Sequence, residues 1–131
     1  EAFTKYIDFF HGKTSYITPE QAIKVILKAG GTPVLAHGVR GDGGSRLGYE
    51  ETLDRVKRFK ELGLMGVEGY YSEFTEEEHQ IMMRIASEEG LLITAGSDCH
   101  GTNKKIALGD TGVIEPDSEV LKRFLEQVQV Y

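Results

Sequence analysis

The chain has 131 residues, the size of one domain, and 40% of them are hydrophobic and 27% charged. Its net charge of −6 argues against a broad electrostatic contact with a nucleic-acid backbone. No apolar run approaches the roughly 18 residues that would predict a transmembrane helix. Because the chain begins at Glu1 and shows no basic region followed by an apolar run, we expect no signal peptide and a piece of a longer protein. Cys99 is the only cysteine, which excludes an intrachain disulfide and favours a reducing, cytoplasmic setting.

The first part of the chain predicts two helices before any strand. Apolar residues recur at helical spacing over 1–10, and the segment 11–13 interrupts them. Thr18 is a good N-cap, Pro19 suits the first helical position, and Gln21 stands where a capping box needs it. The predicted apolar face of this second helix comprises Ala22, Ile23, Val25, Ile26 and Ala29. Two glycines, Gly30 and Gly31, end the helix, and a short buried strand is predicted over 32–36.

Helices and strands alternate along the rest of the chain. A loop over 38–48 with five glycines is the best candidate for a flexible segment. The patterns then predict, in order, a helix over 49–62, a strand over 65–70, a helix over 76–89 with a capping box, a strand over 91–95 buried on both faces, a loop over 96–112, a brief strand over 113–114, and a last helix capped by Asp117 or Ser118. The core face predicted for the last helix is Val120, Leu121, Phe124, Leu125 and Val128.

This alternation predicts an α/β fold with parallel strands joined by helical crossovers. The predicted strands end near His37, Glu68 and Ser97, which lie 31 and 29 residues apart, the length of a βα unit. In parallel sheets and barrels, chemistry collects at the C-terminal ends of the strands. These three places are therefore where functional side chains are expected.

Two of these strand ends carry side chains of the types that bind metal ions in proteins. Asp98 and His100 directly follow a buried strand, and their carboxylate and imidazole can both face one ion; this ligand pair suits Zn, Mn or Fe better than Ca. The alternative is an ordinary turn in which Ser97 and Asp98 cap backbone groups. His37 follows another strand and is either a ligand or base, or a hydrogen-bonded structural residue. Together the three residues could converge on one site.

Several stretches of the sequence resemble one family. They are PVLAHG at 33–38, GVEGYY at 66–71 and GLLITAGSDCHG at 90–101, followed by Asn103-Lys104 and Leu108-Gly109. Together they resemble the C-terminal half of a PHP-domain (polymerase and histidinol phosphatase) metal-dependent phosphoesterase. The branch that hydrolyses nucleotide and oligonucleotide phosphates is the most similar.

The resemblance implies the C-terminal part of a distorted (β/α)₇ barrel with two or three divalent ions, Mn, Zn or Fe, at the strand ends. It implies that 1–17 is a helical lead-in from an inserted subdomain and that 18–131 holds the C-terminal βα units. His37, Asp98 and His100 match three of the metal ligands, and the family's other ligands would lie upstream of Glu1. The sequence departs from the family at Gly38, where proline is common, and at Cys99, where an aromatic residue is common.

Other polar residues have a functional and a structural interpretation. Arg40 resembles a basic position near the substrate phosphate, where a bidentate contact is the expected use; the alternative is a solvated loop arginine. Glu68 either faces the site or supports neighbouring loops, and Cys99 is either an extra soft ligand or, as we favour, points away. For the remaining candidates a solvated position is the favoured interpretation: His11, His79, Lys104 and Lys105.

We therefore expect a hydrolase acting on a phosphorylated small molecule or short nucleic acid, without a membrane partner. With upstream ligands missing, these residues alone are expected to show little or no phosphatase activity. The alternative is a non-catalytic metal- or anion-binding α/β module that self-associates, because an incomplete barrel exposes apolar strand edges and helix faces. A third class, a metal-dependent hydrolase barrel with amide substrates, fits the context around Asp98 less well.

Overall fold

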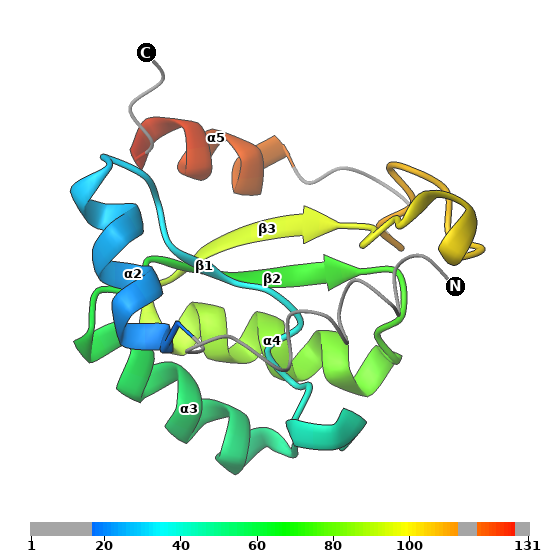
Figure 1. The fold of residues 1–131 in the computed structure, drawn as a ribbon, viewed down its shortest axis with the longest axis horizontal. Helices are drawn as coiled ribbons and strands as arrows, with labels where there is room; N and C mark the ends of the chain where they lie inside the picture. Colours follow the sequence, from blue (N-terminus) through cyan, green and yellow to red (C-terminus); the bar gives the residue numbers. More distant parts are fainter. Residues whose placement is uncertain (1–16, 113–117, 128–131) are drawn as a thin grey trace.

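A computed structural model describes residues 17–112 and 118–127 of the chain, shown in Figure 1. The predictions for 1–16, for the strand over 113–114, for Asp117 and for Val128 fall outside these residues. The elements, in chain order, are α2 (Pro19–Lys28), β1 (Val34–Leu35), the 3₁₀ turn η1 (Asp42–Gly44), α3 (Tyr49–Glu61), β2 (Gly66–Tyr71), α4 (Glu76–Glu89), β3 (Leu92–Gly96), the 3₁₀ turn η2 (Gly101–Asn103) and α5 (Ser118–Gln127). None of the helices in these ranges is long and apolar enough to cross a membrane.

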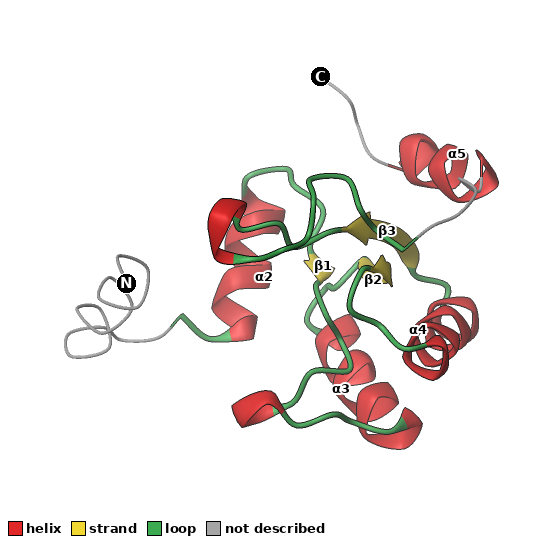
Figure 2. Cartoon of the chain, turned by 90° about the vertical axis from the view of Figure 1, so that its right-hand side faces the viewer, coloured by secondary structure: helices red, strands yellow, loops and turns green. Residues whose placement is uncertain are grey.

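The strands form one parallel three-stranded sheet in the order β1-β2-β3. This confirms the predicted α/β class and its parallel strands. Figure 2, which looks along the sheet, shows α3 and α4 on one side of it and α5 on the other side, next to β3. All three strands run in the same direction, so their C-terminal ends lie together at the right of Figure 1.

The ladder between β2 and β3 contains one irregularity. Glu68 pairs with Thr94 and Tyr70 pairs with Ala95, so Gly69 is an extra residue in β2. Such a β-bulge bends the strand and re-aims the residues that follow it. The Nδ1 atom of His79 on α4 lies 2.8 Å from the Gly69 carbonyl oxygen, so the bulge is held from the helix side.

The helix ends follow the capping chemistry predicted from the sequence. Thr18 and Gln21 form a complete capping box at the start of α2. Thr75 and Glu78 form another at the start of α4, which ends at Gly90 in the left-handed conformation that glycine tolerates. A side-chain oxygen at an N-cap satisfies backbone N–H groups that the helix itself leaves without a partner, which fixes where the helix begins.

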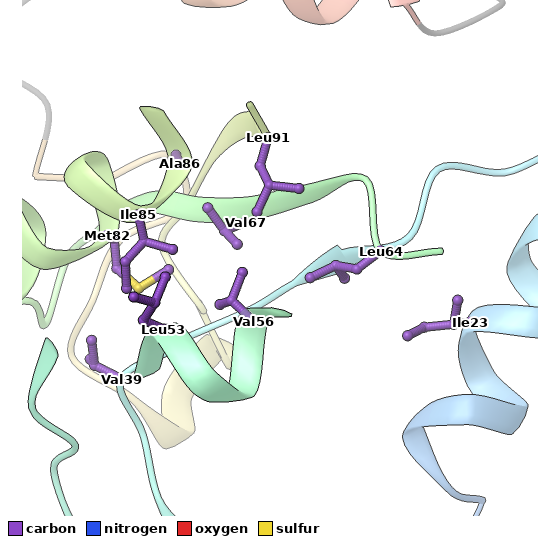
Figure 3. Packing of buried hydrophobic residues seen from close by; sticks show 10 residues of the cluster. All are labelled: Ile23, Val39, Leu53, Val56, Leu64, Val67, Met82, Ile85, Ala86 and Leu91. Carbon is purple, nitrogen blue, oxygen red and sulfur yellow. The ribbon is translucent and has the colours of Figure 1, made fainter. Parts of the chain in front are cut away.

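The hydrophobic core lies between the sheet and the helices α3 and α4. Figure 3 shows Leu53 and Val56 of α3 facing Met82 and Ile85 of α4, with Val67 of β2 beside them. The complete buried cluster comprises Ile23, Val39, Leu53, Val56, Leu64, Val67, Met82, Ile85, Ala86 and Leu91. Met82, Ile85, Val56 and Val67 are fully buried, so these two helices are fixed firmly against one face of the sheet.

The first helix and strand are less buried than predicted. On α2 only Ile23 is buried, whereas Val25 is 60% exposed and Ile26 is 38% exposed. The predicted strand over 32–36 shrinks to Val34–Leu35, because Pro33 has no N–H to donate and His37 adopts a positive φ of 44° that ends the extended backbone. The predicted helix and strand are both present, but the predicted burial of the helix and the predicted length of the strand were wrong.

Two expectations for the later elements also need correction. The strand predicted to be buried on both faces is β3, but it is only partly buried: Leu92 is buried and Ala95 is exposed. On α5, Leu125 was predicted in the core and is 52% exposed. In both cases an apolar composition predicted burial, although β3 is an edge strand of the described sheet and α5 packs mainly against β3.

The loop over 38–48, predicted as the best candidate for a flexible segment, is held by several hydrogen bonds despite its five glycines. Arg40 and Arg46 form an antiparallel bridge, and the N–H of Leu47 donates to the Val39 carbonyl oxygen at 2.9 Å. The Arg55 guanidinium on α3 donates to the carbonyl oxygens of Gly38 at 3.3 Å and of Arg40 at 2.5 Å. The loop therefore has a defined path that holds Arg40 near the strand ends.

Candidate functional site

The three strand ends named by the sequence meet at one edge of the sheet. His37 follows β1, Glu68 lies within β2, and Asp98 and His100 follow β3. The parallel order β1-β2-β3 places the middle residue, Glu68, between the other two positions. The structure therefore brings together the side chains of His37, Asp98 and His100, and it adds Glu68 to them.

Glu68 forms the buried floor of this cluster. Glu68 is only 7% exposed, and its Oε2 accepts a 2.9 Å hydrogen bond from the backbone N–H of His37. The same oxygen lies 3.9 Å from Nε2 of His37. Burial raises the pKa of the Glu68 carboxyl, and the hydrogen bond from His37 opposes that shift. Glu68 both faces the site and supports the turn after β1, so its two predicted interpretations are fulfilled together.

Asp98 links the two histidines. Its Oδ1 lies 3.7 Å from Nε2 of His37 and 3.6 Å from Nδ1 of His100. Its Oδ2 accepts a hydrogen bond of 2.5 Å from Nζ of Lys104. This hydrogen bond is the main cause that lowers the pKa of Asp98, so the carboxylate is ionised at neutral pH.

The imidazole of His100 is oriented by its own turn. Its Nδ1 lies 2.7 Å from the backbone carbonyl oxygen of Asp98. A tautomer that donates through Nδ1 carries its lone pair on Nε2, which is the form in which imidazole binds a metal ion. The backbone contact therefore selects the ligand atom of His100.

Both turns at the site have strained backbones. The φ angles are 44° at His37 and 51° at Asp98, and these are the described non-glycine residues with positive φ. Side chains disfavour this region by about 1–3 kcal/mol per residue, and such strain concentrates at functional sites, where the surrounding structure maintains it. The strain falls on two of the three residues predicted as metal ligands.

The donor set suits the divalent ions predicted from the sequence. Imidazole nitrogens and carboxylate oxygens are common ligands of Zn, Mn and Fe. Two ligands that bind one ion at about 2.1 Å lie roughly 3–4 Å apart, which matches the 3.7 Å between Oδ1 of Asp98 and Nε2 of His37. Within 17–112 and 118–127, however, no three such side chains converge as a closed site. The residues fit the metal as an open, partial ligand set.

A second group of side chains borders this cluster. The Tyr71 phenol is buried, donates to the Glu73 carboxylate, and lies 3.3 Å from Oδ2 of Asp98. Its ring centroid lies 4.8 Å from that of His37. Arg40 and Lys104 both contact Glu73, at 3.2 and 3.3 Å. The basic residue predicted at the substrate phosphate, Arg40, is therefore connected to the candidate ligands through Tyr71 and Glu73.

Sequence reasoning missed most of this second group. The prediction that Lys104 is simply solvated was wrong, because its ammonium group contacts Asp98, Tyr71 and Glu73 and these contacts raise its pKa. Tyr71 lies inside the GVEGYY stretch, directly after the predicted strand over 65–70, and no role was predicted for its side chain. The signal available for Tyr71 was the glycine at position 69, because glycine inside a strand pattern often marks a bulge beside an active site.

The remaining residues considered in the sequence are His79, Cys99, Lys105 and His11. His79 was predicted on a solvated face, and this was wrong: it is half-buried, and its ring lies 4.9 Å from that of Tyr70. Cys99 is a free, half-buried thiol. Lys105 is exposed, as predicted, and His11 lies outside the described residues.

Comparisons with known proteins find relatives of this chain that are named phosphoesterases, and one that is named an amidohydrolase. No family model matches the chain. Over 86 residues the chain is 30% identical to a phosphoribosyl 1,2-cyclic phosphate 1,2-diphosphodiesterase from Eggerthella lenta, which corresponds to 66% of this chain and 29% of that protein. A crystal structure from Bifidobacterium adolescentis, provisionally named a metal-dependent phosphoesterase, has a TM-score of 0.67 and 29% identity, covering 86% of this chain and 37% of its own.

A further similar structure is an amidohydrolase from Chromobacterium violaceum, solved with bound sulfate and no metal. It has a TM-score of 0.65 and 25% identity, and the match covers 87% of this chain and 38% of that protein. The chain thus spans well under half the length of each relative. All three relatives are named as hydrolases. The comparisons confirm the resemblance to PHP-like metal-dependent phosphoesterases, over part of the length of those proteins.

Proposed function

We propose that this chain contributes the C-terminal strand-end ligands of a metal-dependent phosphoesterase. The observation that carries the proposal is the meeting of His37 and Asp98, 3.7 Å apart, on two strained turns at one edge of a parallel sheet. His37, Asp98 and His100 would hold divalent ions, Mn, Zn or Fe, with Glu68 as a further carboxylate beneath them. Two or three ions would occupy the complete site, and its remaining ligands would come from chain outside 1–131.

Each residue then has a distinct task. Divalent ions at such a site supply an activated water and stabilise negative charge on phosphoryl oxygens. Glu68 holds the backbone of His37 through the 2.9 Å hydrogen bond and thereby orients that imidazole. Arg40 would bind the phosphate of the substrate.

The whole protein would be a (β/α)₇ barrel that takes up phosphate esters of nucleotides or oligonucleotides in the cytoplasm. In it, 18–131 would form the C-terminal βα units and 1–17 a lead-in from an inserted subdomain. The parallel βα units described above support this architecture. The name of the Eggerthella lenta relative refers to a cyclic phosphate diester, so phosphodiesters as well as phosphomonoesters are substrates to test.

Manganese binding tests the ligand assignment directly. Mn²⁺ added to the 131-residue chain should lose the sharp solution lines of its electron paramagnetic resonance spectrum as it binds. We expect His37→Ala and Asp98→Asn each to weaken that binding about tenfold or more. Glu77→Gln removes an exposed carboxylate outside the site and should leave the affinity unchanged. Equal affinity in all of these variants would refute the site.

The isolated chain should hydrolyse phosphomonoesters weakly or not at all, because its ligand set is partial. Robust hydrolysis by these 131 residues that His100→Ala abolishes would contradict this expectation. A longer natural chain with the upstream ligands should instead be active and lose its activity with the same substitution.

A second candidate function is a non-catalytic metal- or anion-binding module that self-associates. The exposed apolar residues of α2, with Val25 at 60% and Leu27 at 39%, favour it over a fully covered monomer. Sedimentation velocity separates the two candidates. A monomer at concentrations of about 100 μM would contradict self-association at this affinity.

A further inference from the structure

Three side chains from distant parts of the sequence converge on the Glu73 carboxylate. Arg40 Nη2 donates to its Oε2 at 3.2 Å, Lys104 Nζ approaches the same oxygen at 3.3 Å, and the phenol of Tyr71 donates to it as well. Arg40 and Lys104 also lie over the Tyr71 ring, at 5.9 and 5.8 Å from its centroid. A guanidinium, an ammonium and a phenol directed at a single oxygen form a binding site for an anion.

The anion that occupies this site is the Glu73 carboxylate of the chain itself, and its side chain can rotate out of the site. Glu73 follows β2 in the short connection to α4, and its side chain is 39% exposed. The three donors belong to other elements or to the strand itself: Arg40 is held by the loop bridge to Arg46, and Tyr71 is 5% exposed. Displacing Glu73 therefore requires a side-chain rotation, while the donors stay in place.

The site also has donor capacity that Glu73 does not use. The Nε atom of Arg40 is buried and has no hydrogen-bond partner among the described residues. Lys104 divides its ammonium group between Glu73 and Asp98. A phosphate has more acceptor oxygens than a carboxylate, so it can accept hydrogen bonds from Nη2 of Arg40, the Lys104 ammonium group and the Tyr71 phenol on separate oxygens. The donors that now share one oxygen of Glu73 therefore suit a phosphate.

We propose that Arg40, Tyr71 and Lys104 form a phosphate-binding site that Glu73 closes from within, so that an incoming phosphate must displace the Glu73 carboxylate. This rests on the proposed phosphoesterase function for its biological meaning, and it adds an internal competitor that the chain carries itself. The expected consequence is that substrates lacking a doubly charged phosphate bind poorly, because they compete badly with Glu73. Glu73 thus sets a threshold for ligand charge.

Binding of inorganic phosphate to the 131-residue chain, in buffer stripped of divalent ions, tests the proposal. Glu73→Gln removes the competing charge but keeps the shape, and we expect phosphate to bind about tenfold more tightly, since the apparent affinity of a closed site is reduced by the fraction that is open. Glu73→Ala should give the same result. The control is Glu77→Gln, which removes an equal charge from an exposed residue at the start of α4. It should change the affinity less than about twofold.

The location of the bound phosphate is a second readout. In Glu73→Gln, the Nε–H resonance of Arg40 should shift on phosphate addition, and Arg40→Met in that background should cancel the gain in affinity. Equal tightening by Glu73→Gln and Glu77→Gln, or no tightening by either Glu73 variant, would overturn the proposal. Because no metal is present, this result is independent of Mn²⁺ binding: loss of the manganese site in wild type would refute the proposed function and leave the phosphate result to decide this inference.

Discussion

A methyl group at position 96 should disturb the site through Glu68 alone. Gly96 is the last residue of β3, and a Cβ built there would collide with Oε1 of Glu68, with the carboxyl carbon 3.4 Å away. In Gly96→Ala the carboxylate has to move by about 1 Å to restore an ordinary contact. Because the movement of Oε1 also displaces Oε2, we expect Oε2 to lose the 2.9 Å hydrogen bond that it accepts from the N–H of His37.

The size of the effect follows from that single bond. A hydrogen bond to a charged group contributes about 1.5–3 kcal/mol. Replacing glycine by alanine restricts the unfolded chain and returns about 0.4–1 kcal/mol. We therefore expect Gly96→Ala to lower the free energy of unfolding by about 0.5–2.6 kcal/mol. This corresponds to a shift of roughly 0.25–1.3 M in the urea midpoint if m is about 2 kcal/mol/M.

Urea unfolding followed by circular dichroism measures this change, and a double-mutant cycle tests its cause. In a Glu68→Ala background the obstructing carboxylate is gone, so Gly96→Ala should cost close to nothing there. Gly48→Ala is the matched control, because a Cβ at that position meets no atom within 4 Å. An equal loss of stability from Gly96→Ala with and without Glu68 would refute the reasoning.

Two further predictions concern the support beneath the site. Met82 of α4 is fully buried in the core. Met82→Ala should therefore lower the free energy of unfolding by about 2–5 kcal/mol, whereas Met82→Leu should lower it by less than about 1.5 kcal/mol. Similar urea midpoints for the two variants would contradict tight packing around Met82. His79→Phe keeps the ring contact with Tyr70 but loses the contact with the Gly69 carbonyl oxygen, and it should cost about 1 kcal/mol; a stability equal to wild type would show that this contact carries no net energy.

Local signals in the sequence predicted the helix starts and the strand ends well. The capping boxes at Thr18 and Thr75 depend on residues three apart, so their pattern can be recognised from a short stretch of sequence. The regular spacing of βα units predicted the parallel sheet, and the sheet in turn brings His37 and Asp98 within 3.7 Å. Side-chain identity and strand order were therefore sufficient for the centre of the candidate site.

Contacts between distant loops were beyond the reach of sequence patterns. Lys104 reaches Glu73 across 31 residues of sequence, and neither residue belongs to a periodic segment. His79 has acidic neighbours typical of a solvated helix face, yet its Nδ1 lies 2.8 Å from the Gly69 carbonyl oxygen. Which side chain fills such a position depends on how α4 and the loop after β3 lie on the sheet, and no local pattern encodes that.

The extra residue in β2 determines which side chains can share the site. Glu68 and Tyr71 are three positions apart, and in a regular strand they would point to opposite faces of the sheet. Their partners on β3, Thr94 and Gly96, are only two positions apart. The bulge thus turns an odd separation along the chain into an even one across the ladder, and both side chains approach His37. Deleting Gly69 would send every later side chain of β2 to the other face, so Tyr71 would no longer lie on the same side of the sheet as Glu68.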